Sequence, residues 1–403
     1  CTDSSRMRHS TVRGAIEYLG GKQMDFNQTE EQIMLRSAIE RLVHSMCTPE
    51  KVRQWDRDGS YPEEVYAAMV DAGFVSMVVP AEYGGMGSPM SDCIILYEEV
   101  AKPSVDFATR IALQAWGCSI LADVAPEELK REFLPRVAQG EAKLSFSLTE
   151  PSSGSDAASL TTSARRDGDD WLINGQKVFS SGADAPDNHI VLAVRTAKSD
   201  KRHDGISLFL VPNDLKGITI RRLDVIGRRV LGLSEIYFDD VRVPSRYLLG
   251  EEGKGWGYIG RHLERERITL AANYLGCASS ALNDATIYAQ ERKQFGRPIG
   301  QFQAIAHMLA DMATEVECGR WLTAMAAWRY DNGLSCRKEA SMAKLYVSEM
   351  LQRVTASGMQ ILGGHAYTTD HAMQRHWRDA RNATVGGGTS QIQRELIARE
   401  LGL

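Results

Sequence analysis

The chain has few of the features needed to bind nucleic acid, cross a membrane or build a disulfide framework. Its seven cysteines are odd in number, scattered and never spaced as Cys-x-x-Cys, which favours a reducing compartment and argues against structural zinc. No apolar run approaches the roughly 18 residues that would span a bilayer. A net charge of -5 on interspersed acidic and basic residues offers no basic surface to a nucleic acid. The nine histidines show no ligand spacing, so no metal site is expected.

The first residues, 1–23, lack the apolar core of a signal peptide. Their arginines and serines resemble a transit peptide in composition, but Met24-Asp25-Phe26 is typical of a natural start. We therefore interpret 1–23 as an N-terminal extension without fixed structure. The expected location is the bacterial cytoplasm, with the mitochondrial matrix as the alternative.

Length and composition predict several packed units. At 403 residues, with 43% hydrophobic and 25% charged residues, the chain exceeds what one hydrophobic core usually supports. The pattern predicts a helical domain over 24–143, a small β domain over 144–250 and a four-helix bundle over 251–403. The fold class is therefore α+β, because no β-α-β alternation indicates a doubly wound sheet.

Local signals mark individual elements within these units. Thr29-Glu30-Glu31-Gln32 is a capping box that begins the first helix. Asn174-Gly175 separates two short β-type runs and predicts a tight hairpin turn. Helix signals then run without a break from about Trp256 to Arg292.

One glutamate on this last helix lies on a face that is otherwise apolar. At about 100° per residue, the side chains within about 60° of Glu266 are Ile259, Leu263, Leu270 and Cys277. Glu264 points elsewhere. Burial of an unpaired carboxylate costs several kcal/mol and raises its pKa, which suits a proton-abstracting base. The alternative interpretation is a surface carboxylate paired with Arg265 or Arg267.

Two loops have the composition of ligand-binding segments. Thr149 to Asp156 is rich in hydroxyls and turn formers and can present N–H and O–H groups to a polar ring or a phosphate. Gly386-Gly387-Gly388-Thr389-Ser390 allows a close backbone approach and precedes a helix whose N-terminus favours anions. Each loop is equally typical of an ordinary polar turn. No Walker loop, nucleophile elbow, zinc helix or dinucleotide turn competes with them.

Together these segments resemble the acyl-CoA dehydrogenase family over a span from about Met24 to Leu403. In chain order, the motifs that carry the resemblance are Pro80-Ala81-Glu82-Tyr83-Gly84-Gly85, Leu148-Thr149-Glu150-Pro151, Gly154-Ser155-Asp156, Asn174-Gly175-Gln176-Lys177, Glu291-Arg292-Lys293-Gln294-Phe295-Gly296, Gln360-Ile361-Leu362-Gly363-Gly364, Arg378-Asp379-Ala380-Arg381 and Gly388-Thr389-Ser390-Gln391-Ile392-Gln393. Each motif is weak alone, whereas their order and spacing are specific. The resemblance implies a helical domain, a β-barrel and a helical bundle, with bound FAD and an acyl-CoA substrate.

The resemblance also implies the site residues. Around the flavin they are Phe146, Leu148, Thr149, Gly154, Ser155, Phe179, Ser180, Ser181, Thr389 and Gln391. The residues expected to reach the nucleotide part of FAD bound to a neighbouring subunit are Arg292, Phe295, Gln303, Gln360, Gly363 and Gly364. Ser155, Arg267 and Gly388 are expected to contact the substrate. Shared cofactor sites imply a homotetramer built as a dimer of dimers.

The position of the base departs from the commonest family pattern. Most members carry the catalytic glutamate immediately before Gly-Thr-Ser-Gln, where this chain has Gly387. A minority, including members that resemble the isovaleryl and long-chain types, carry it on the first bundle helix before an arginine, and Glu266-Arg267 matches that position. We therefore predict Glu266 as the base and the Gly387 N–H as a donor to the thioester oxygen. The resemblance further implies that electrons pass to an electron-transferring flavoprotein.

Three other functions stay open at this point. The same site could act as an enoyl-CoA reductase, because a helix glutamate with three glycines also resembles the crotonobetainyl-CoA reductase type. An acyl-CoA oxidase fits less well, since the chain is short for that branch. Finally, Gly387 is compatible with a catalytically inactive subunit that only binds acyl-CoA or flavin.

Overall fold

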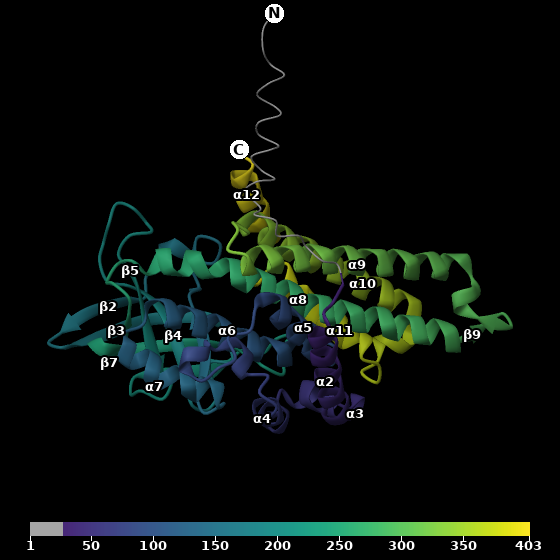
Figure 1. Ribbon diagram of the computed structural model, residues 1–403, viewed down its shortest axis with the longest axis horizontal. Coiled ribbons are helices and arrows are strands. Elements are labelled where there is room, and N and C mark those ends of the chain that lie inside the picture. Colours follow the sequence, from purple (N-terminus) through teal and green to yellow (C-terminus); the bar gives the residue numbers. More distant parts are fainter. Residues whose placement is uncertain (1–26) are drawn as a thin grey trace, which may run out of the picture.

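The computed structural model describes residues 27–403 (Figure 1). The extension predicted for 1–23 and the domain start at Met24 lie outside the described residues.

The first part of the described chain is helical. Its helices are α2 (Glu30–Met46), α3 (Pro49–Asp58), α4 (Glu63–Asp71), α5 (Met90–Ala101), α6 (Val105–Val124) and α7 (Glu127–Ala138). The capping box predicted at the start of α2 is confirmed, because the Thr29 hydroxyl accepts from the Gln32 N–H and the Gln32 amide oxygen accepts from the Thr29 N–H, both at 3.2 Å. Helices α5 and α6 both pack against the long helix α8 (Gly255–Glu291) of the C-terminal part.

The middle of the chain forms one sheet. Its strands are β1 (Lys143–Ser147), β2 (Ser163–Asp167), β3 (Asp170–Ser181), β4 (Asn188–Arg195), β5 (Ile206–Pro212), β6 (Ile218–Arg222), β7 (Leu233–Pro244) and β8 (Leu248–Leu249). The hydrogen-bonded order is β6-β7-β3-β2-β4-β5-β8, and β1 joins it by parallel pairing with β4. The β domain expected in the middle of the chain is thereby confirmed. The boundaries given for the three domains stay predictions.

The hairpin predicted at Asn174-Gly175 is wrong. Both residues lie inside the continuous strand β3, and the hairpin turn occurs earlier, where Asp167 of β2 pairs with Asp170 of β3. Gly175 instead marks an irregularity in the pairing of β3 with β7. Its φ is 142°, and an added Cβ would lie 2.7 Å from the Thr162 backbone, so close packing rather than a turn explains this glycine.

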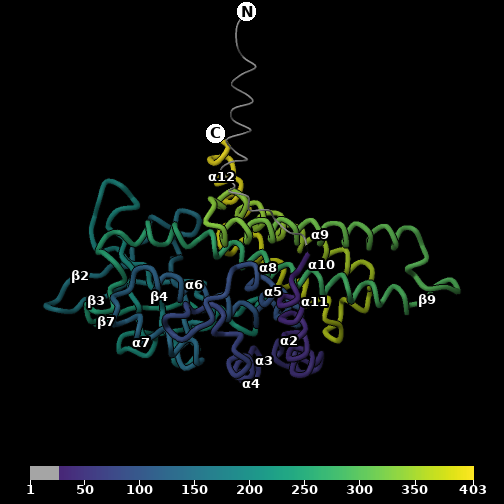
Figure 2. The backbone as a smooth tube through the Cα atoms, viewed as in Figure 1, coloured from purple at the N-terminus to yellow at the C-terminus, as the bar shows by residue number. Residues whose placement is uncertain are grey.

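The C-terminal part is a helical bundle. Its helices are α8 (Gly255–Glu291), α9 (Gln303–Asp331), α10 (Arg337–Leu362), α11 (Met373–Ala383) and α12 (Ser390–Glu400). Helices α8, α9 and α10 run side by side along the molecule (Figure 2). The unbroken helix predicted from Trp256 to Arg292 is confirmed as α8. A short hairpin of β9 (Lys293–Gln294) and β10 (Arg297–Pro298) joins α8 to α9 at the end of the bundle opposite the sheet (Figure 1).

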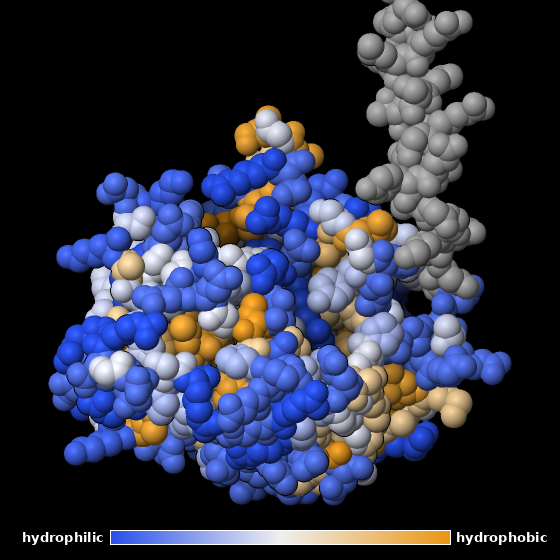
Figure 3. Space-filling view, turned by 60° about the vertical axis from the view of Figure 1, so that its left-hand side comes forward, coloured by the Kyte–Doolittle hydropathy of each residue, from blue (hydrophilic) through white to orange (hydrophobic). Residues whose placement is uncertain are grey.

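The surface is mainly hydrophilic on the face in Figure 3, where apolar side chains gather in small patches. Within residues 27–403 no helix combines the length and the apolar character needed to cross a membrane.

A buried polar joint connects the three parts of the chain. Asp106 on α6 forms an ion pair with Arg228, in the segment between β6 and β7, and also accepts from the Val230 N–H at 3.0 Å. The Arg228 N–H donates to Asp379 on α11 at 2.6 Å. All three charged residues are at most 7% exposed. The joint therefore fixes the helical domain and the sheet against the bundle.

Candidate active site

Glu266 lies on the side of α8 that faces the interior. Ile259 and Cys277, which share its face, are each 1% exposed, and Leu270 is half-buried. Within residues 27–403, the Glu266 carboxylate accepts no hydrogen bond, and no cationic side-chain nitrogen lies within 4.0 Å of it, the distance limit for an ion pair. The surface pairing with Arg265 or Arg267, given above as the alternative, is therefore not formed.

The surroundings of Glu266 favour its protonated form. Burial raises the pKa of Glu266 above its ordinary value, and the nearby cations Arg267 and Lys344 only partly oppose this effect. Glu264 behaves differently, because it accepts a hydrogen bond from the Cys336 thiol at 3.2 Å. Of the two glutamates, Glu266 is the one without a hydrogen-bond partner among the described residues.

The glycine turn between α11 and α12 meets α8 at Glu266. Gly387 and Gly388 have φ values of 63° and 85°, in the left-handed region that favours glycine. A Cβ added to Gly387 would lie 3.9 Å from Oε1 of Glu266 and only 2.3 Å from Cδ1 of Leu270. The turn therefore brings bare backbone next to the carboxylate.

This turn leaves backbone donors available. The Gln393 side-chain amide donates to the carbonyls of Gly387 and Gly388, at 3.1 Å and 3.2 Å. In the part of the chain that the structure describes, no atom accepts a hydrogen bond from the N–H groups of Gly387 and Gly388. Unpartnered N–H groups beside a carboxylate are suited to bind an oxygen that gains negative charge. Arg267 lies next to Glu266 on α8, is 5% exposed, and its Nε atom has no partner among residues 27–403.

The helix that follows the turn begins at a capped residue. The Thr389 hydroxyl accepts from the Ile392 N–H at 3.2 Å, as expected for an N-cap, while Gln391 is exposed.

On the sheet side, Glu150 organises the polar loop. Its carboxylate accepts from the Lys177 ammonium at 2.8 Å, from the Thr161 N–H and hydroxyl at 2.7 Å, and from the Thr162 N–H at 2.8 Å. Burial would raise the pKa of Glu150, but Lys177 and these hydrogen bonds outweigh it and lower the pKa to about 2. Lys177 also donates to the carbonyl of Leu148 at 3.1 Å, and the Thr149 carbonyl accepts from the Val178 N–H at 2.9 Å. The loop is thus fixed onto β3.

Phe179 follows this anchor and has a strained backbone. Its φ is 60°, at a shift in the pairing of β3 with β7, and the residue is 61% exposed. An aromatic residue persists in the left-handed region only where its surroundings impose it, and such positions gather at ligand sites. Ser181 also lies on β3, whereas the Ser180 hydroxyl is buried against the Ser147 hydroxyl at 2.7 Å, so only the backbone of Ser180 can face a ligand.

Phe146 packs against Trp116 of α6, with ring centroids 4.0 Å apart. Gly154 and Ser155 lie on the exposed part of the loop.

The other predicted cofactor residues form a second group at the far end of the bundle. Arg292 caps the end of α8, Gln303 begins α9, and the segment Gln360 to Gly364, including Gly363, ends α10. Phe295 in the connecting hairpin is 94% exposed with a φ of 51°. Arg292 follows Glu266 by 26 residues of α8, so the two lie about 39 Å apart along the axis.

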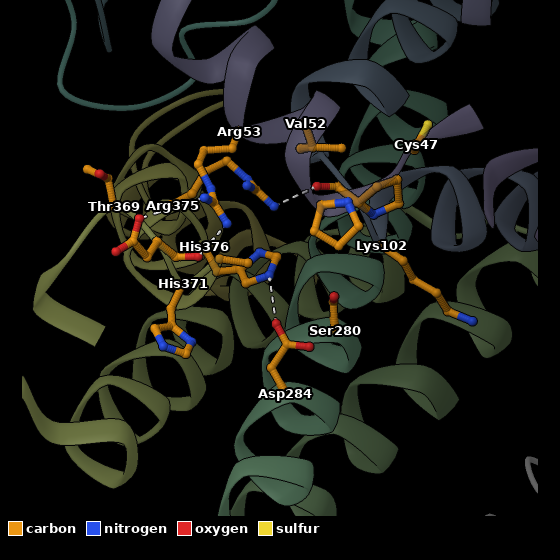
Figure 4. A pocket seen from close by; sticks show the side chains of 14 residues that line it. Cys47, Val52, Arg53, Lys102, Ser280, Asp284, Thr369, His371, Arg375 and His376 are labelled. Atoms are coloured by element: carbon orange, nitrogen blue, oxygen red, sulfur yellow. Dashed lines mark hydrogen bonds and ion pairs between the residues drawn. The ribbon is translucent and has the colours of Figure 1, made fainter. Parts of the chain in front are cut away.

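A separate cavity of about 140 Å³ lies between α3, the end of α5, α8 and α11 (Figure 4). Its polar groups largely pair with one another. Arg53 donates to the Asp370 carbonyl at 2.7 Å, Arg375 donates to the Pro103 carbonyl at 3.0 Å, and His376 lies 3.6 Å from Asp284. None of the predicted site residues lines this cavity, so it is distinct from the site at Glu266.

Comparison with known protein families agrees with this geometry. The models for the N-terminal, middle and C-terminal domains of acyl-CoA dehydrogenases match residues 29–141, 145–241 and 253–402. The chain belongs to the acyl-CoA dehydrogenase family.

Individual relatives match this acyl-CoA dehydrogenase over nearly its whole length. The probable acyl-CoA dehydrogenase YngJ of Bacillus subtilis (strain 168) is 38% identical over 383 residues, which cover 94% of this chain and 100% of that protein. The butyryl-CoA dehydrogenase of Megasphaera elsdenii superposes with a TM-score of 0.90 at 31% identity, covering 94% of this chain and 100% of that chain. The FAD complex of PigA superposes with a TM-score of 0.89 at 26% identity, again covering 94% and 100%.

The chain is therefore an FAD-dependent oxidoreductase of the acyl-CoA dehydrogenase family. The residues present fit this cofactor. Phe179 holds an exposed ring where a flat heterocycle could stack, and the anchored loop at Thr149 and the N–H groups of the glycine turn offer polar contacts.

Sequence reasoning missed the roles of Glu150 as an anchor and of Lys344 beside Glu266. Lys344 could have been found, because the argument that selects Glu266 applies to it. Ala340, Val347 and Leu351 occupy its helical face and are all 0% exposed. Glu150 gave no such signal, since its partners come from two other segments of the sheet.

Proposed function

We propose that this acyl-CoA dehydrogenase removes hydrogen from the α and β carbons of an acyl-CoA thioester, with Glu266 as the base. The approach of Glu266 to the Gly387 turn carries the proposal. An unpaired carboxylate with a raised pKa is positioned beside N–H groups that have no partner among the described residues. This pairing serves a reaction that removes a proton while negative charge develops on a neighbouring oxygen.

Each residue then has one task. The Glu266 carboxylate accepts the α-proton, and the N–H of Gly387 donates a hydrogen bond to the thioester oxygen as charge grows there. Bound FAD supplies the acceptor for the hydride from the β-carbon. Arg267 and Gly388 contact the substrate from the helical bundle, and Ser155 contacts it from the β domain. Helices α5 and α6 pack against α8, and in this proposal their packing limits the access of water to the site.

The experiment that tests the base is anaerobic mixing of the yellow protein with a panel of acyl-CoA thioesters. Glu266→Gln keeps the volume and hydrogen-bonding reach of the side chain but cannot accept the proton, so flavin and thioester should still bind. Bleaching of the flavin band should fall by at least about 100-fold. Glu264→Gln, whose carboxylate is bound by Cys336, is the matched control and should bleach normally.

The outcomes separate the alternatives. Near-normal flavin bleaching by Glu266→Gln would overturn the assignment of Glu266 as the base. Binding without bleaching by the unmodified chain across the whole panel would favour an inactive binding subunit. Reoxidation of the reduced protein by an enoyl-CoA, faster than its reduction by the acyl-CoA, would favour the enoyl-CoA reductase direction.

The family resemblance supports an electron-transferring flavoprotein as the acceptor of the electrons. Reduction of such a flavoprotein by the substrate-reduced enzyme would test this. The free cysteines among the described residues agree with a reducing compartment, and we place the protein in the bacterial cytoplasm.

We further propose a homotetramer built as a dimer of dimers. The group around Arg292 lies about 39 Å along α8 from Glu266, so it is remote from the cofactor end that the same chain's base would face. A neighbouring copy could bring this group to the nucleotide end of its partner's FAD. Sedimentation of a monomer with full flavin content would contradict the assembly.

A further inference from the structure

Lys344 is a buried lysine that the proposed chemistry does not use. It lies on α10, and its exposed fraction is 0%. Burial of an ammonium group is costly unless hydrogen bonds and opposite charges compensate. The partners of Lys344 therefore indicate why the charge is there.

The ammonium group joins the two ends of the glycine turn. It donates to the carbonyl of Ala383, the last residue of α11, at 3.1 Å, and to the carbonyl of Gly388 at 2.5 Å. Gly388 directly precedes Thr389, the N-cap of α12. Because carbonyls at a helix C-terminus carry partial negative charge, a cation is favoured at Ala383.

These bonds also orient the turn. Within a trans peptide the C=O of one residue and the N–H of the next point in opposite directions. Because Lys344 binds the Gly388 carbonyl, the Thr389 N–H points away from α10. In the same way, the bond from Gln393 to the Gly387 carbonyl makes the Gly388 N–H point away from Gln393. The two bonds from Lys344, which we call the clamp, and the bond from Gln393 thus fix the two peptides that follow Gly387, the residue that lies beside Glu266.

The charge of Lys344 acts on Glu266 as well. The charged groups in electrostatic contact with Lys344 are Glu266 and Arg267 on α8 and Glu349 on its own helix. Glu349 is already paired with Arg394 of α12 at 2.8 Å. Burial lowers the pKa of Lys344 to about 8 although Glu266 raises it, so the amine is charged at neutral pH.

We propose that Lys344 is a positioning residue of the active site, which clamps the turn 384–388 beside Glu266 and, by its positive charge, partly offsets the effect of burial and so favours the ionised form of the Glu266 carboxylate. This inference rests on the proposed role of Glu266 as the base.

Three substitutions separate the clamp from the charge. Lys344→Gln keeps a donor for the carbonyls but removes the charge, Lys344→Met removes both, and Lys344→Arg keeps the charge. Ser348→Ala, one turn further along α10 at an equally buried residue, is the matched control. The measurements are flavin content, thioester binding and the rate of anaerobic flavin bleaching between about pH 5.5 and 8.5.

We expect Lys344→Gln to retain FAD and thioester binding while the acid limb of its rate profile moves to higher pH by about one unit. Its rate near pH 6 should then fall roughly tenfold and recover as the pH rises, because one pKa unit is a tenfold change in ionisation. Lys344→Met should also be slower at every pH, since the turn is no longer clamped. Ser348→Ala should keep the unmodified profile.

If Lys344→Gln folds and the acid limb of its rate profile stays at the pH of the unmodified protein, the inference is overturned. Should the Gln and Met variants fail to fold, Lys344→Arg decides. If the acid limb of Lys344→Arg lies at the same pH as that of the unmodified protein, the role of the charge is supported. If the acid limb moves although the charge is retained, the inference is overturned. Failure of the proposed function is distinguishable, because Glu266→Gln would then bleach normally whatever the Lys344 variants do.

Discussion

Gly387 and Glu266 approach the same point in space, since a Cβ added to Gly387 would lie 3.9 Å from Oε1 of Glu266. The first belongs to a turn and the second to a helix, so two separate backbone segments converge on one position. The proposed base Glu266 on α8 would therefore take the place of the glutamate that precedes Gly-Thr-Ser-Gln in the common family pattern.

A glutamate at position 387 in the glycine turn should replace the proposed base Glu266 only if a neighbouring side chain is shortened to make space for it. In the Glu266→Gln background, Gly387→Glu alone is expected to remain inactive, because its Cβ would lie 2.3 Å from Cδ1 of Leu270. A side chain at a φ of 63° also costs roughly 1 to 2 kcal/mol. Adding Leu270→Ala should restore flavin bleaching at least about tenfold above the Glu266→Gln, Leu270→Ala control. Equal rates in stopped-flow measurements would show that the two positions are not equivalent.

The anchor of the loop from Thr149 to Asp156, which we expect to contact the flavin, should be sensitive to the loss of one charge. Glu150→Gln leaves the Lys177 ammonium buried without its counterion, a change that typically costs about 3 to 5 kcal/mol. We expect loss of FAD during gel filtration and a clearly lower unfolding temperature. Asp167→Asn, which breaks an exposed pair with Arg242 on the same sheet, should leave both properties unchanged. Full FAD retention by Glu150→Gln would contradict the anchoring role.

Stability should fall as the pH rises from about 4 to about 7 through Asp379. Burial, followed by the nearby charge of Asp106, raises the pKa of Asp379 from 3.8 to about 7. Across this range the folded state holds a proton that the unfolded state has released, so raising the pH favours unfolding. Asp379→Asn should therefore flatten the dependence of the unfolding temperature on pH in this interval. An unchanged slope would show that Asp379 ionises normally in the folded protein.

The proposed assembly predicts complementation between two inactive variants. Glu266→Gln lacks the base but keeps Arg292, whereas Arg292→Ala keeps the base and should bind FAD weakly. If Arg292 completes the partner's cofactor site, a mixed dimer contains one site with both groups intact. Co-expression of differently tagged chains, followed by purification through both tags, should recover bleaching that neither variant shows alone. No recovery in a verified mixed dimer would place Arg292 in its own chain's site.

Periodicity and motifs predicted the elements whose determinants are local. The capping box at Thr29, the uninterrupted α8 and the apolar face around Glu266 all follow from spacing along one helix. The hairpin at Asn174-Gly175 failed because the close approach of Thr162 to Gly175, a tertiary contact, decides that glycine. A local turn signal carries no information about such a neighbour.

The polar joints were beyond prediction for the same reason. Asp106 and Arg228 are 122 residues apart, and Glu150 and Lys177 belong to different segments of the sheet. Each of these residues is typical of a solvated surface when judged alone. Their burial becomes understandable only when the partner and its position are known.

The length of α8 has a further consequence for how this chain can evolve. In the proposed assembly the single helix α8 places Glu266 at the FAD of its own chain and Arg292 at the FAD of a neighbouring chain. Insertion of a single residue between them would rotate one end against the other by about 100° and displace both functions together. Substitutions along α8 are tolerable wherever packing allows, whereas insertions and deletions are not. Selection is thus expected to preserve the number of residues in this stretch more strictly than their identity.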